Sequence, residues 1–280
     1  MIGFIGLGVM GEPMCRNLAR KSGRQVVAWD TRREPLERLI ADGVAAARSI
    51  GEVAEKAEIV FLSLPGEKEI REVSKELKNA VVDCSTAPVS LAKELSERIK
   101  DFADAPVART RQAAIDGTLS IMVGASDALF ARIEPLLRCM ATDVTHCGPP
   151  GAGQAVKLLN NMVLSVTVMA LAEALAVAKA SGAVDPKLLF ETLMKGSADS
   201  FALRNHGMKA LLPETHPEKA FPVNYMLKDV GYALELARSA GLSLPAGGTV
   251  FELLKETREL GFGEAYHTAI IEAIRKRRAP

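Results

Sequence analysis

Cysteine is scarce in this sequence. The four cysteines form no CxxC pair and have no histidine at metal-ligand spacing; they are Cys15, Cys84, Cys139 and Cys147. A disulfide framework is therefore not expected, and a reducing cytoplasm is the expected compartment. The four histidines also lack metal-ligand spacing, and we expect each to be packed or on the surface: His146, His206, His216 and His267. No metal site is predicted.

An excess of charge of either sign is also absent. Lys and Arg together number 35 and Asp and Glu 34, which gives a net charge of +1. This balance gives no electrostatic reason to expect nucleic acid or an acidic membrane surface as a partner. The one basic cluster, residues 275–278, is expected to be the solvated carboxyl end of a helix.

Long apolar runs are absent except at residues 158–178. That run is long enough to cross a membrane, but two asparagines and a glutamate interrupt it, and Lys157 and Lys179 flank it. We therefore expect a buried helix and no membrane span. The first expected strand begins at the second residue, so no signal or transit peptide is expected and the protein is predicted to be cytoplasmic.

The first half of the chain alternates apolar runs with amphipathic stretches. We expect strands at residues 2–5, 25–29, 57–64, 80–83, 102–104 and 119–123. Helices are expected between them, at residues 12–21, 34–42, 68–78 and 90–100. This alternation predicts an α/β fold with a doubly wound, mostly parallel sheet that helices cover on both faces.

The character of the chain changes at the glycine- and proline-rich stretch 148–153, which predicts a hinge. Beyond it we expect only helices, at residues 153–181, 185–194, 201–212, 226–240, 245–259 and 265–276. The second half is therefore predicted to be an all-helical domain. Its long apolar helix also predicts self-association, as a homodimer or a homotetramer.

A glycine-rich turn follows the first strand and opens the first helix, with the sequence Gly6-Leu7-Gly8-Val9-Met10-Gly11. Gly6 allows the tight turn, Gly8 lets the backbone approach a pyrophosphate, and Gly11 lets the helix pack on the sheet. The helix N-terminus then offers N–H groups to the diphosphate. The turn predicts a Rossmann dinucleotide-binding domain at residues 1–152, against the alternative of a plain glycine-rich turn. Residues 153–280 would be the helical substrate and oligomerisation domain.

The end of the second strand bears on the choice of cofactor. Asp30 lies about 20 residues past the glycines, where a carboxylate can accept both ribose hydroxyls and would repel a 2′-phosphate. Arg32 and Arg33 follow, and an arginine could instead pair with a 2′-phosphate. We favour NAD and keep NADP as the alternative.

Two later strand ends are expected at the same edge of the sheet. Leu64-Pro65 and Ser85-Thr86 follow buried strands, and ligands of doubly wound sheets lie outside the carboxyl ends of the strands. These positions either contact the cofactor and substrate or simply end the strands.

A lysine and two amides stand at the start of the long helix. Lys157 and Asn161 are four residues apart and project from one helical face, with Asn160 beside them. Oxidising an alcohol needs a group that takes the hydroxyl proton, and a buried lysine can do so if its pKa falls towards about 7–8. An amide can orient the alcohol or a carboxylate. The alternative is a helix end that reaches solvent.

The chain resembles the β-hydroxyacid dehydrogenases, the family of 3-hydroxyisobutyrate dehydrogenase and tartronate semialdehyde reductase. Four segments carry the resemblance, in family order: residues 6–14, 104–107 with 117–119, 151–161, and 228–231. The resemblance implies a Rossmann domain and a helical domain with the active site between them. An imine reductase, a related class, would be expected to lack Lys157.

The resemblance also implies roles for single residues. Lys157 would be the catalytic acid and base, and Asn161 with Asn160 would hold the substrate. The nicotinamide half of the cofactor would contact Leu64, Pro65 and Thr86, with Lys228 closing over it. Ser85 and Phe201 would lie beside the substrate; the alternative for Phe201 is an ordinary core residue.

One loop departs from the family pattern. Most members continue Asp-Ala-Pro-Val with Ser-Gly-Gly, whereas this chain reads Ala108-Arg109-Thr110-Arg111. The loop resembles that of sulfolactaldehyde reductase, and the Arg109 fork could bind a carboxylate, phosphate or sulfonate. The alternative is that both arginines lie on the loop surface, and Arg111 has no support for a substrate role.

These features predict an NAD(P)-dependent oxidoreductase of a small anionic β-hydroxyacid or its semialdehyde, of the 3-hydroxyisobutyrate or 3-sulfolactaldehyde type. Two alternatives remain. One is a dinucleotide-binding scaffold that has lost catalysis, and the other is a dehydrogenase of a different small hydroxyacid such as L-serine.

Overall fold

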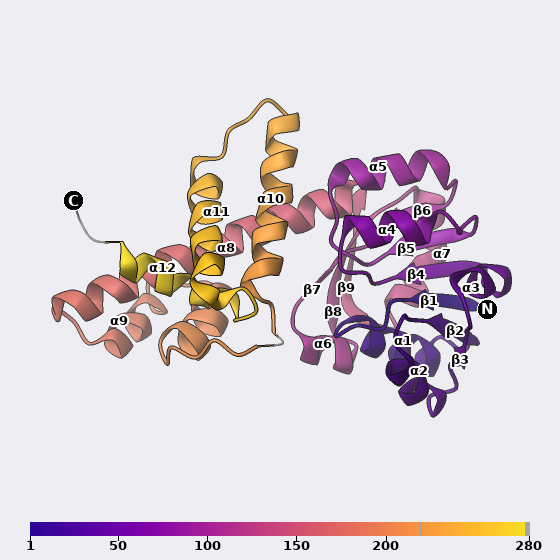
Figure 1. Ribbon diagram of the computed structural model, residues 1–280, viewed down its shortest axis with the longest axis horizontal. Coiled ribbons are helices and arrows are strands. Elements are labelled where there is room, and N and C mark those ends of the chain that lie inside the picture. The colour runs from indigo at the N-terminus through magenta and orange to yellow at the C-terminus, as the bar shows by residue number, and fades with distance from the viewer. Residues whose placement is uncertain (219, 278–280) are drawn as a thin grey trace. The chain divides into compact units, whose positions relative to one another are not determined.

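The computed structural model describes residues 1–218 and 220–277, which form two compact units that divide after Lys157 (Figure 1). The first unit is an α/β domain, and the second is helical. The predicted fold class is confirmed. The division falls inside one long helix, five residues beyond the domain boundary that the sequence suggests.

The described strands of the first unit form one nine-stranded sheet, in the order β3-β2-β1-β4-β5-β6-β8-β7, with β9 beside β8. The pairings among β1 to β6 are parallel, whereas β8 runs antiparallel to β6 and β7 and parallel to β9. The strands are β1 (Ile2–Ile5), β2 (Val26–Trp29), β3 (Ala45–Ala46), β4 (Ile59–Leu62), β5 (Ala80–Asp83), β6 (Phe102–Asp104), β7 (Val107–Ala108), β8 (Leu119–Gly124) and β9 (Ala141–Gly148).

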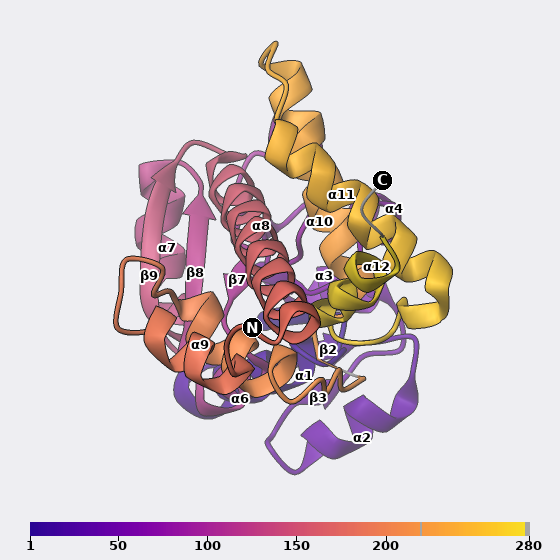
Figure 2. The same cartoon turned by 90° about the vertical axis from the view of Figure 1, so that its left-hand side faces the viewer.

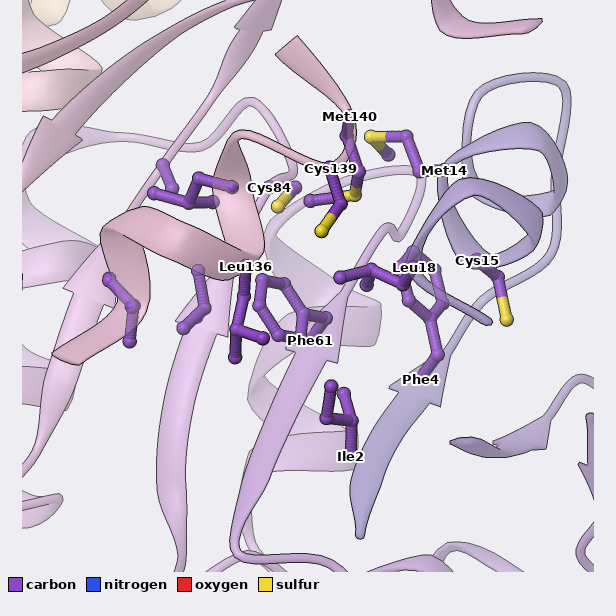
Figure 3. Packing of buried hydrophobic residues seen from close by; sticks show 14 of the residues in the cluster. Ile2, Phe4, Met14, Cys15, Leu18, Phe61, Cys84, Leu136, Cys139 and Met140 are labelled. Atoms are coloured by element: carbon purple, nitrogen blue, oxygen red, sulfur yellow. The ribbon is translucent and has the colours of Figure 1, made fainter. Parts of the chain in front are cut away.

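Helices cover both faces of this sheet, because alternate strand residues point to opposite sides. Phe4 and Phe61 of neighbouring strands stack on one side, where Leu18 and Leu136 join them (Figure 3). Ile5 faces the second core, on the other side. The first core is packed by α1 (Gly11–Lys21), α2 (Arg33–Ile40), α6 (Arg111–Asp116) and α7 (Asp127–Leu137); the second by α3 (Ile50–Lys56), α4 (Glu67–Ser74) and α5 (Val89–Arg98).

The strand order creates a switch point at β1. The chain passes from β1 to β2 and β3 on one side, then returns to β4 on the other side. The connections at the carboxyl ends of β1 and β4 therefore leave in opposite directions, and ligands of doubly wound sheets bind in the crevice this leaves. The glycine turn follows β1 at this point.

The second unit is built from α8 and the helices that follow it. α10 and α11 lie side by side, as both views show, and residues of both helices belong to the core of buried side chains in this unit (Figures 1 and 2). Across its described residues the unit has no strand, and only an isolated bridge joins Pro222 to Tyr266. The elements are α8 (Ala152–Ser181), α9 (Pro186–Leu193), η1 (Leu203–Leu211), α10 (Val223–Ser239), α11 (Pro245–Thr257), η2 (Arg258–Phe262), η3 (His267–Ala269) and α12 (Ile270–Lys276).

α8 is the one described helix whose length and composition would suffice to cross a membrane, and 44% of its most apolar window is buried within the protein. A core helix passes the same test of length and composition. The burial is in keeping with the packed helix that the sequence predicts.

Several elements differ from the prediction. The helices α3, α6 and α7 and the strands β3, β7 and β9 were not predicted. β9 was not predicted because its side chains are largely polar: Asp143 and Thr145 are exposed on this strand, which among the described residues pairs with β8 alone. In the second unit, η1 is π-helical where an α-helix was expected, and η3 begins the last helix with a 3-10 turn.

Candidate active site

The glycine turn has the geometry that a dinucleotide requires. Gly6 has a φ of 94°, and a Cβ there would collide with the carbonyl oxygen of Ser63. A Cβ on Gly11 would collide with the Gly6 carbonyl, so α1 can approach the turn closely only with glycine there. Gly8 has nothing within 4 Å of its Cβ position. The turn is tight on its protein side and open at Gly8, where a diphosphate would approach.

The N-terminus of α1 supplies the charge complement for that diphosphate. No side chain caps the helix at Met10, so the positive end of the helix dipole is left for a ligand, although the Glu12 N–H already donates to the Gly8 carbonyl at 3.1 Å. The one carboxylate in the first turn, Glu12, is paired with Arg38 and Arg16. Its hydrogen bond to Arg38 lowers the pKa of Glu12 and, with that to Arg16, outweighs the effect of burial.

Asp30 lies beside the glycine turn. One carboxylate oxygen accepts the Leu7 N–H at 2.6 Å, and the other accepts the Arg32 N–H at 2.9 Å and its Nε at 3.2 Å. Burial by itself would raise the pKa of Asp30, but these bonds from Arg32 and Leu7 outweigh burial and lower it. The Arg32 guanidinium also donates to the Leu7 carbonyl at 3.1 Å. An ionised carboxylate thus stands where the adenosine ribose is expected, with an arginine folded onto it.

The strand ends of β4 and β5 are tied together. The Leu64 N–H donates to the Ser85 hydroxyl at 2.9 Å, and the Ser85 N–H donates to Asp83 at 3.0 Å. Ser85 is buried, whereas Thr86 is half-buried. The structure therefore brings the predicted Leu64-Pro65 and Ser85-Thr86 turns together at one edge of the sheet. The Ser85 hydroxyl is already a hydrogen-bond acceptor for the Leu64 N–H there.

The first turn of α8 joins this edge through a glutamine. Gln154 is fully buried; its Nε2 donates to the Ser85 carbonyl at 2.8 Å, and its Oε1 accepts the Ala87 N–H at 3.1 Å. Lys157 lies one helical turn further on and is only 8% exposed. The first unit therefore holds the predicted catalytic lysine on a helix that is bonded to the Thr86 turn.

Asp104, at the end of β6, anchors the start of that helix. Its carboxylate accepts the N–H groups of Gly151 at 2.6 Å and Gln154 at 2.7 Å. Burial raises the pKa of Asp104 to about 6, although these N–H donors act in the opposite direction. A Cβ on Gly124 or Gly153 would collide with neighbouring oxygens, so glycine at both positions lets the strand and the helix close on the carboxylate.

Arg109 holds the loop that departs from the family pattern, through three hydrogen bonds of its own side chain. Its guanidinium donates to the Thr118 carbonyl at 2.6 Å, the Thr142 hydroxyl at 2.8 Å and the Asp143 carboxylate at 2.6 Å. Arg109 has a φ of 86°, a conformation that non-glycine residues rarely adopt. Arg111 begins α6. The guanidinium of Arg109, which the sequence predicts to bind a substrate anion, therefore already binds the carboxylate of Asp143.

In the second unit, Asn161 and Lys228 meet at one carboxylate. The Asn161 amide donates to Asp229 at 2.7 Å, and the Lys228 ammonium lies 3.5 Å from the same side chain. Asn160 is exposed and donates to the Asn161 amide oxygen at 3.1 Å. The Lys228 ammonium also lies over the rings of Tyr225 and Tyr232, 5.6 and 5.7 Å from their centres.

Phe201, also in the second unit, is 64% exposed, and its ring meets that of His206 edge-on at 5.9 Å. It is not the core residue that its sequence position would also allow. The predicted site residues thus fall into two groups. The first unit holds Gly6, Leu7, Gly8, Val9, Met10, Gly11, Asp30, Leu64, Pro65, Ser85, Thr86, Arg109 and Lys157, and the second holds Asn160, Asn161, Phe201 and Lys228.

Sequence reasoning missed three residues that support this site. Gln154, Asp104 and Asp229 are buried polar side chains that each bond a segment far away in sequence. The available signal was a polar side chain inside an otherwise apolar run. That signal flags a buried polar group but does not reveal its partner.

Known proteins share both halves of this arrangement. The family model described as the NAD binding domain of 6-phosphogluconate dehydrogenase matches residues 1–148. The model described as NAD-binding of NADP-dependent 3-hydroxyisobutyrate dehydrogenase matches residues 151–274.

Individual relatives match over nearly their whole length. The 2-(hydroxymethyl)glutarate dehydrogenase of Eubacterium barkeri is 34% identical over 97% of this chain and 93% of its own. The 2-hydroxy-3-oxopropionate reductase of Escherichia coli strain K12 is 33% identical over 98% and 96%. The structure of 3-hydroxyisobutyrate dehydrogenase from Mycobacterium tuberculosis with L-serine matches with a TM-score of 0.89, at 29% identity and over 98% of each chain.

Proposed function

Because the chain belongs to the β-hydroxyacid dehydrogenase family, whose members are NAD(P)-dependent oxidoreductases of hydroxyacids, we propose that it interconverts a small anionic β-hydroxyacid and its semialdehyde with Lys157 as acid and base. The observation that carries this proposal is the placement of Lys157. This lysine is buried and lies one helical turn after Gln154. The Gln154 side chain is hydrogen-bonded to Ser85 and to Ala87, the two neighbours of Thr86 at the carboxyl end of β5.

The cofactor fits the residues of the first unit. Gly8 leaves space for the diphosphate, and Asp30 is an ionised acceptor for the ribose hydroxyls, which favours NAD. Arg32 balances the charge of Asp30, so NADP stays the alternative. When bound, the nicotinamide supplies or accepts the hydride. The proposed contacts are Gly6, Leu7, Gly8, Val9, Met10, Gly11, Asp30, Leu64, Pro65, Thr86 and Lys228.

Lys157 moves the proton in this proposal. When the alcohol is oxidised, the lysine accepts the hydroxyl proton as the hydride leaves carbon; in the reverse direction it returns that proton to the oxygen. Because Lys157 is buried, bulk water competes little for the proton.

Asn161 and Asn160 would orient the substrate on the same face of α8 as Lys157, because Lys157 and Asn161 are four residues apart. Asp229 fixes the Asn161 amide in one orientation. Ser85 and Phe201 are proposed as neighbours of the substrate.

Arg109 is proposed to receive the anionic end of the substrate. Its planar fork suits a carboxylate or a sulfonate, and the Asp143 carboxylate is the group that the substrate anion would displace. The substrate is therefore of the 3-hydroxyisobutyrate or 3-sulfolactaldehyde type. L-Serine is a second candidate, because a relative of the same fold was solved with it.

Steady-state kinetics with both cofactors tests the substrate class. We expect 3-sulfolactaldehyde or 3-hydroxyisobutyrate to give a higher kcat/KM than succinate semialdehyde or L-serine. A preference for L-serine would move the proposal to the second candidate. Activity with none of the four would contradict both.

The Lys157→Ala variant tests the catalytic role. We expect absorbance changes at 340 nm to slow by at least about 10²-fold, the usual contribution of an acid or base. Lys179→Ala is the matched control, because this lysine lies on the same helix and is paired with Glu214 at the surface. Equal rates in wild type and Lys157→Ala would remove Lys157 from the mechanism. No activity in the wild type would instead favour a dinucleotide-binding scaffold.

Two further expectations belong to this proposal. We propose a homodimer or homotetramer that works in the cytoplasm, with no nucleic acid or membrane as partner. Exposed apolar side chains on α8 support self-association: Val156, Leu159, Val163 and Val177 are 43–66% exposed.

A further inference from the structure

Gln154 is a polar side chain with no exposed surface, which is unusual in a helix as apolar as α8. Its amide makes two hydrogen bonds to backbone groups that lie on either side of Thr86. Nε2 donates to the Ser85 carbonyl at 2.8 Å, and Oε1 accepts the Ala87 N–H at 3.1 Å. The side chain thus binds the turn that follows β5 at two points, the residue before Thr86 and the residue after it.

The backbone of the same residue is fixed from another direction. The Gln154 N–H donates to Asp104 at 2.7 Å, beside the bond from Gly151 to the same carboxylate at 2.6 Å. The Ser85 hydroxyl in turn accepts the Leu64 N–H. Through one residue, α8 is therefore bonded to the ends of β5 and β6, and through Ser85 also to the end of β4.

Only an amide of this length satisfies both backbone groups. Glutamate offers an acceptor for the Ala87 N–H but, when ionised, no donor for the Ser85 carbonyl. Methionine has the same length but offers no donor and only a weakly accepting sulfur. A buried group left without its partner costs about 1–3 kcal/mol, so this geometry is strongly specified.

We propose that Gln154 is a positioning residue for catalysis: it sets the distance between the Thr86 turn and Lys157, one helical turn away. This inference rests on the proposed role of Lys157. Gln154 takes no part in the transfer of the proton or the hydride. Its two hydrogen bonds instead hold Lys157 at a fixed position relative to the end of β5, where the nicotinamide and the substrate are expected.

The expected effect is on the chemical step. A misplacement of about 1 Å costs roughly 10²-fold in rate, so Gln154→Met should lower kcat about 10–100-fold. The affinity for NADH, measured by fluorescence titration, should change less than about threefold, because the glycine turn and Asp30 are untouched and only the proposed nicotinamide contact at Thr86 would shift. The deuterium isotope effect with 4-deuterated NADH should rise as hydride transfer becomes rate-limiting.

A second readout needs neither substrate nor cofactor. Hydrogen exchange of the peptide that contains Ala87 should be faster in Gln154→Met than in the wild type, because its N–H has lost its acceptor. Gln25→Met is the matched control, since Gln25 is exposed at the amino end of β2, and it should match the wild type in every measurement.

If Gln154→Met does not fold, Gln154→Glu keeps the test open. It retains the acceptor for Ala87, and its kcat relative to wild type should recover as the pH falls, because protonation returns a donor to the Ser85 carbonyl. The inference would be overturned by a kcat and isotope effect equal to the wild type in Gln154→Met, or by a kcat of Gln154→Glu that equals the wild type at every pH. Lys157→Ala measured in parallel separates the two failures: full activity there would overturn the role of Lys157 itself.

Discussion

Arg109 combines an unusual backbone conformation with a side chain that makes three hydrogen bonds and stays partly exposed. A non-glycine residue at a φ of 86° costs about 1–3 kcal/mol unless its surroundings compensate. Here three hydrogen bonds do so, to Thr118, Thr142 and Asp143. The guanidinium therefore holds the loop in shape and, at 42% side-chain exposure, also offers a charged fork at the surface of the unit.

Substitutions at position 109 separate these two roles. Arg109→Ala should raise the KM of anionic substrates about 10–100-fold, the value of a lost charge-assisted hydrogen bond. Arg109→Gly, which adopts a positive φ freely, should be equally impaired because it also lacks the charge. Asp143→Asn should lower that KM, since it removes the competing carboxylate. A wild-type KM in Arg109→Gly beside a raised one in Arg109→Ala would show that Arg109 acts only on the conformation of the loop.

At the scale of elements, η1 and η3 gather ionisable rings inside the second unit. The His206 Nδ1 pairs with the Tyr266 hydroxyl at 2.6 Å, and the His206 and His267 rings lie 5.0 Å apart. Burial, with a smaller effect of Lys209, lowers the pKa of His206 to about 4, and burial lowers that of His267 well below its ordinary value. Among the described residues no three such side chains form a metal site. These histidines are therefore packed as neutral rings.

This packing makes the second unit sensitive to acid. The folded pKa of His206 lies below its ordinary value of 6.5, so the unfolded chain takes up the proton first. Stability should therefore fall as the pH drops from 6.5 to 4, by about 3 kcal/mol for this residue. Urea unfolding of His206→Asn, which keeps an acceptor near Tyr266, should show a shallower pH dependence. His146→Asn, in the first unit, is the control; identical pH profiles for His206→Asn and wild type would contradict the prediction.

At the scale of the whole molecule, α8 has a stripe of exposed side chains with a period of seven residues. Val156, Val163, Ala170 and Val177 are all exposed, so they share one side of the helix over three heptads. A monomer would leave this apolar stripe in water. A second copy of the chain would cover it, which is why we expect an oligomer.

Light scattering coupled to size exclusion tests this expectation. The wild type should have two or four times the mass of one chain. The double variant Val163→Lys, Val177→Lys should shift towards the mass of a single chain, because burying two ammonium groups in an apolar interface is costly. Leu188→Lys, at an exposed apolar position on α9, should leave the mass unchanged. A monomeric wild type would refute the prediction.

The sequence by itself determined whatever depends on neighbours along the chain. The Gly6, Gly8 and Gly11 spacing, the alternation of strands with helices and the i, i+4 pair of Lys157 and Asn161 are local patterns, and local physics turns them into a turn, a fold class and a helix face. Short or polar elements such as α3 and β9 were not predicted, because their hydrophobic periodicity is weak and they form through packing or pairing with distant segments.

Tertiary structure alone decided which distant groups meet. Gln154 and Ser85 are 69 residues apart, Asn161 and Asp229 are 68 apart, and Arg109 and Asp143 are 34 apart. No periodicity links such pairs. The Gln154 and Asn161 bonds form because a buried donor or carboxylate must find a partner once the sheet and helices have packed, whereas Arg109 and Asp143 are exposed and meet because folding brings their segments together. The local motifs thus identify an NAD(P)-dependent oxidoreductase and pick out Lys157 as its proposed acid and base, and the long-range bonds decide how that lysine and the Arg109 loop are held.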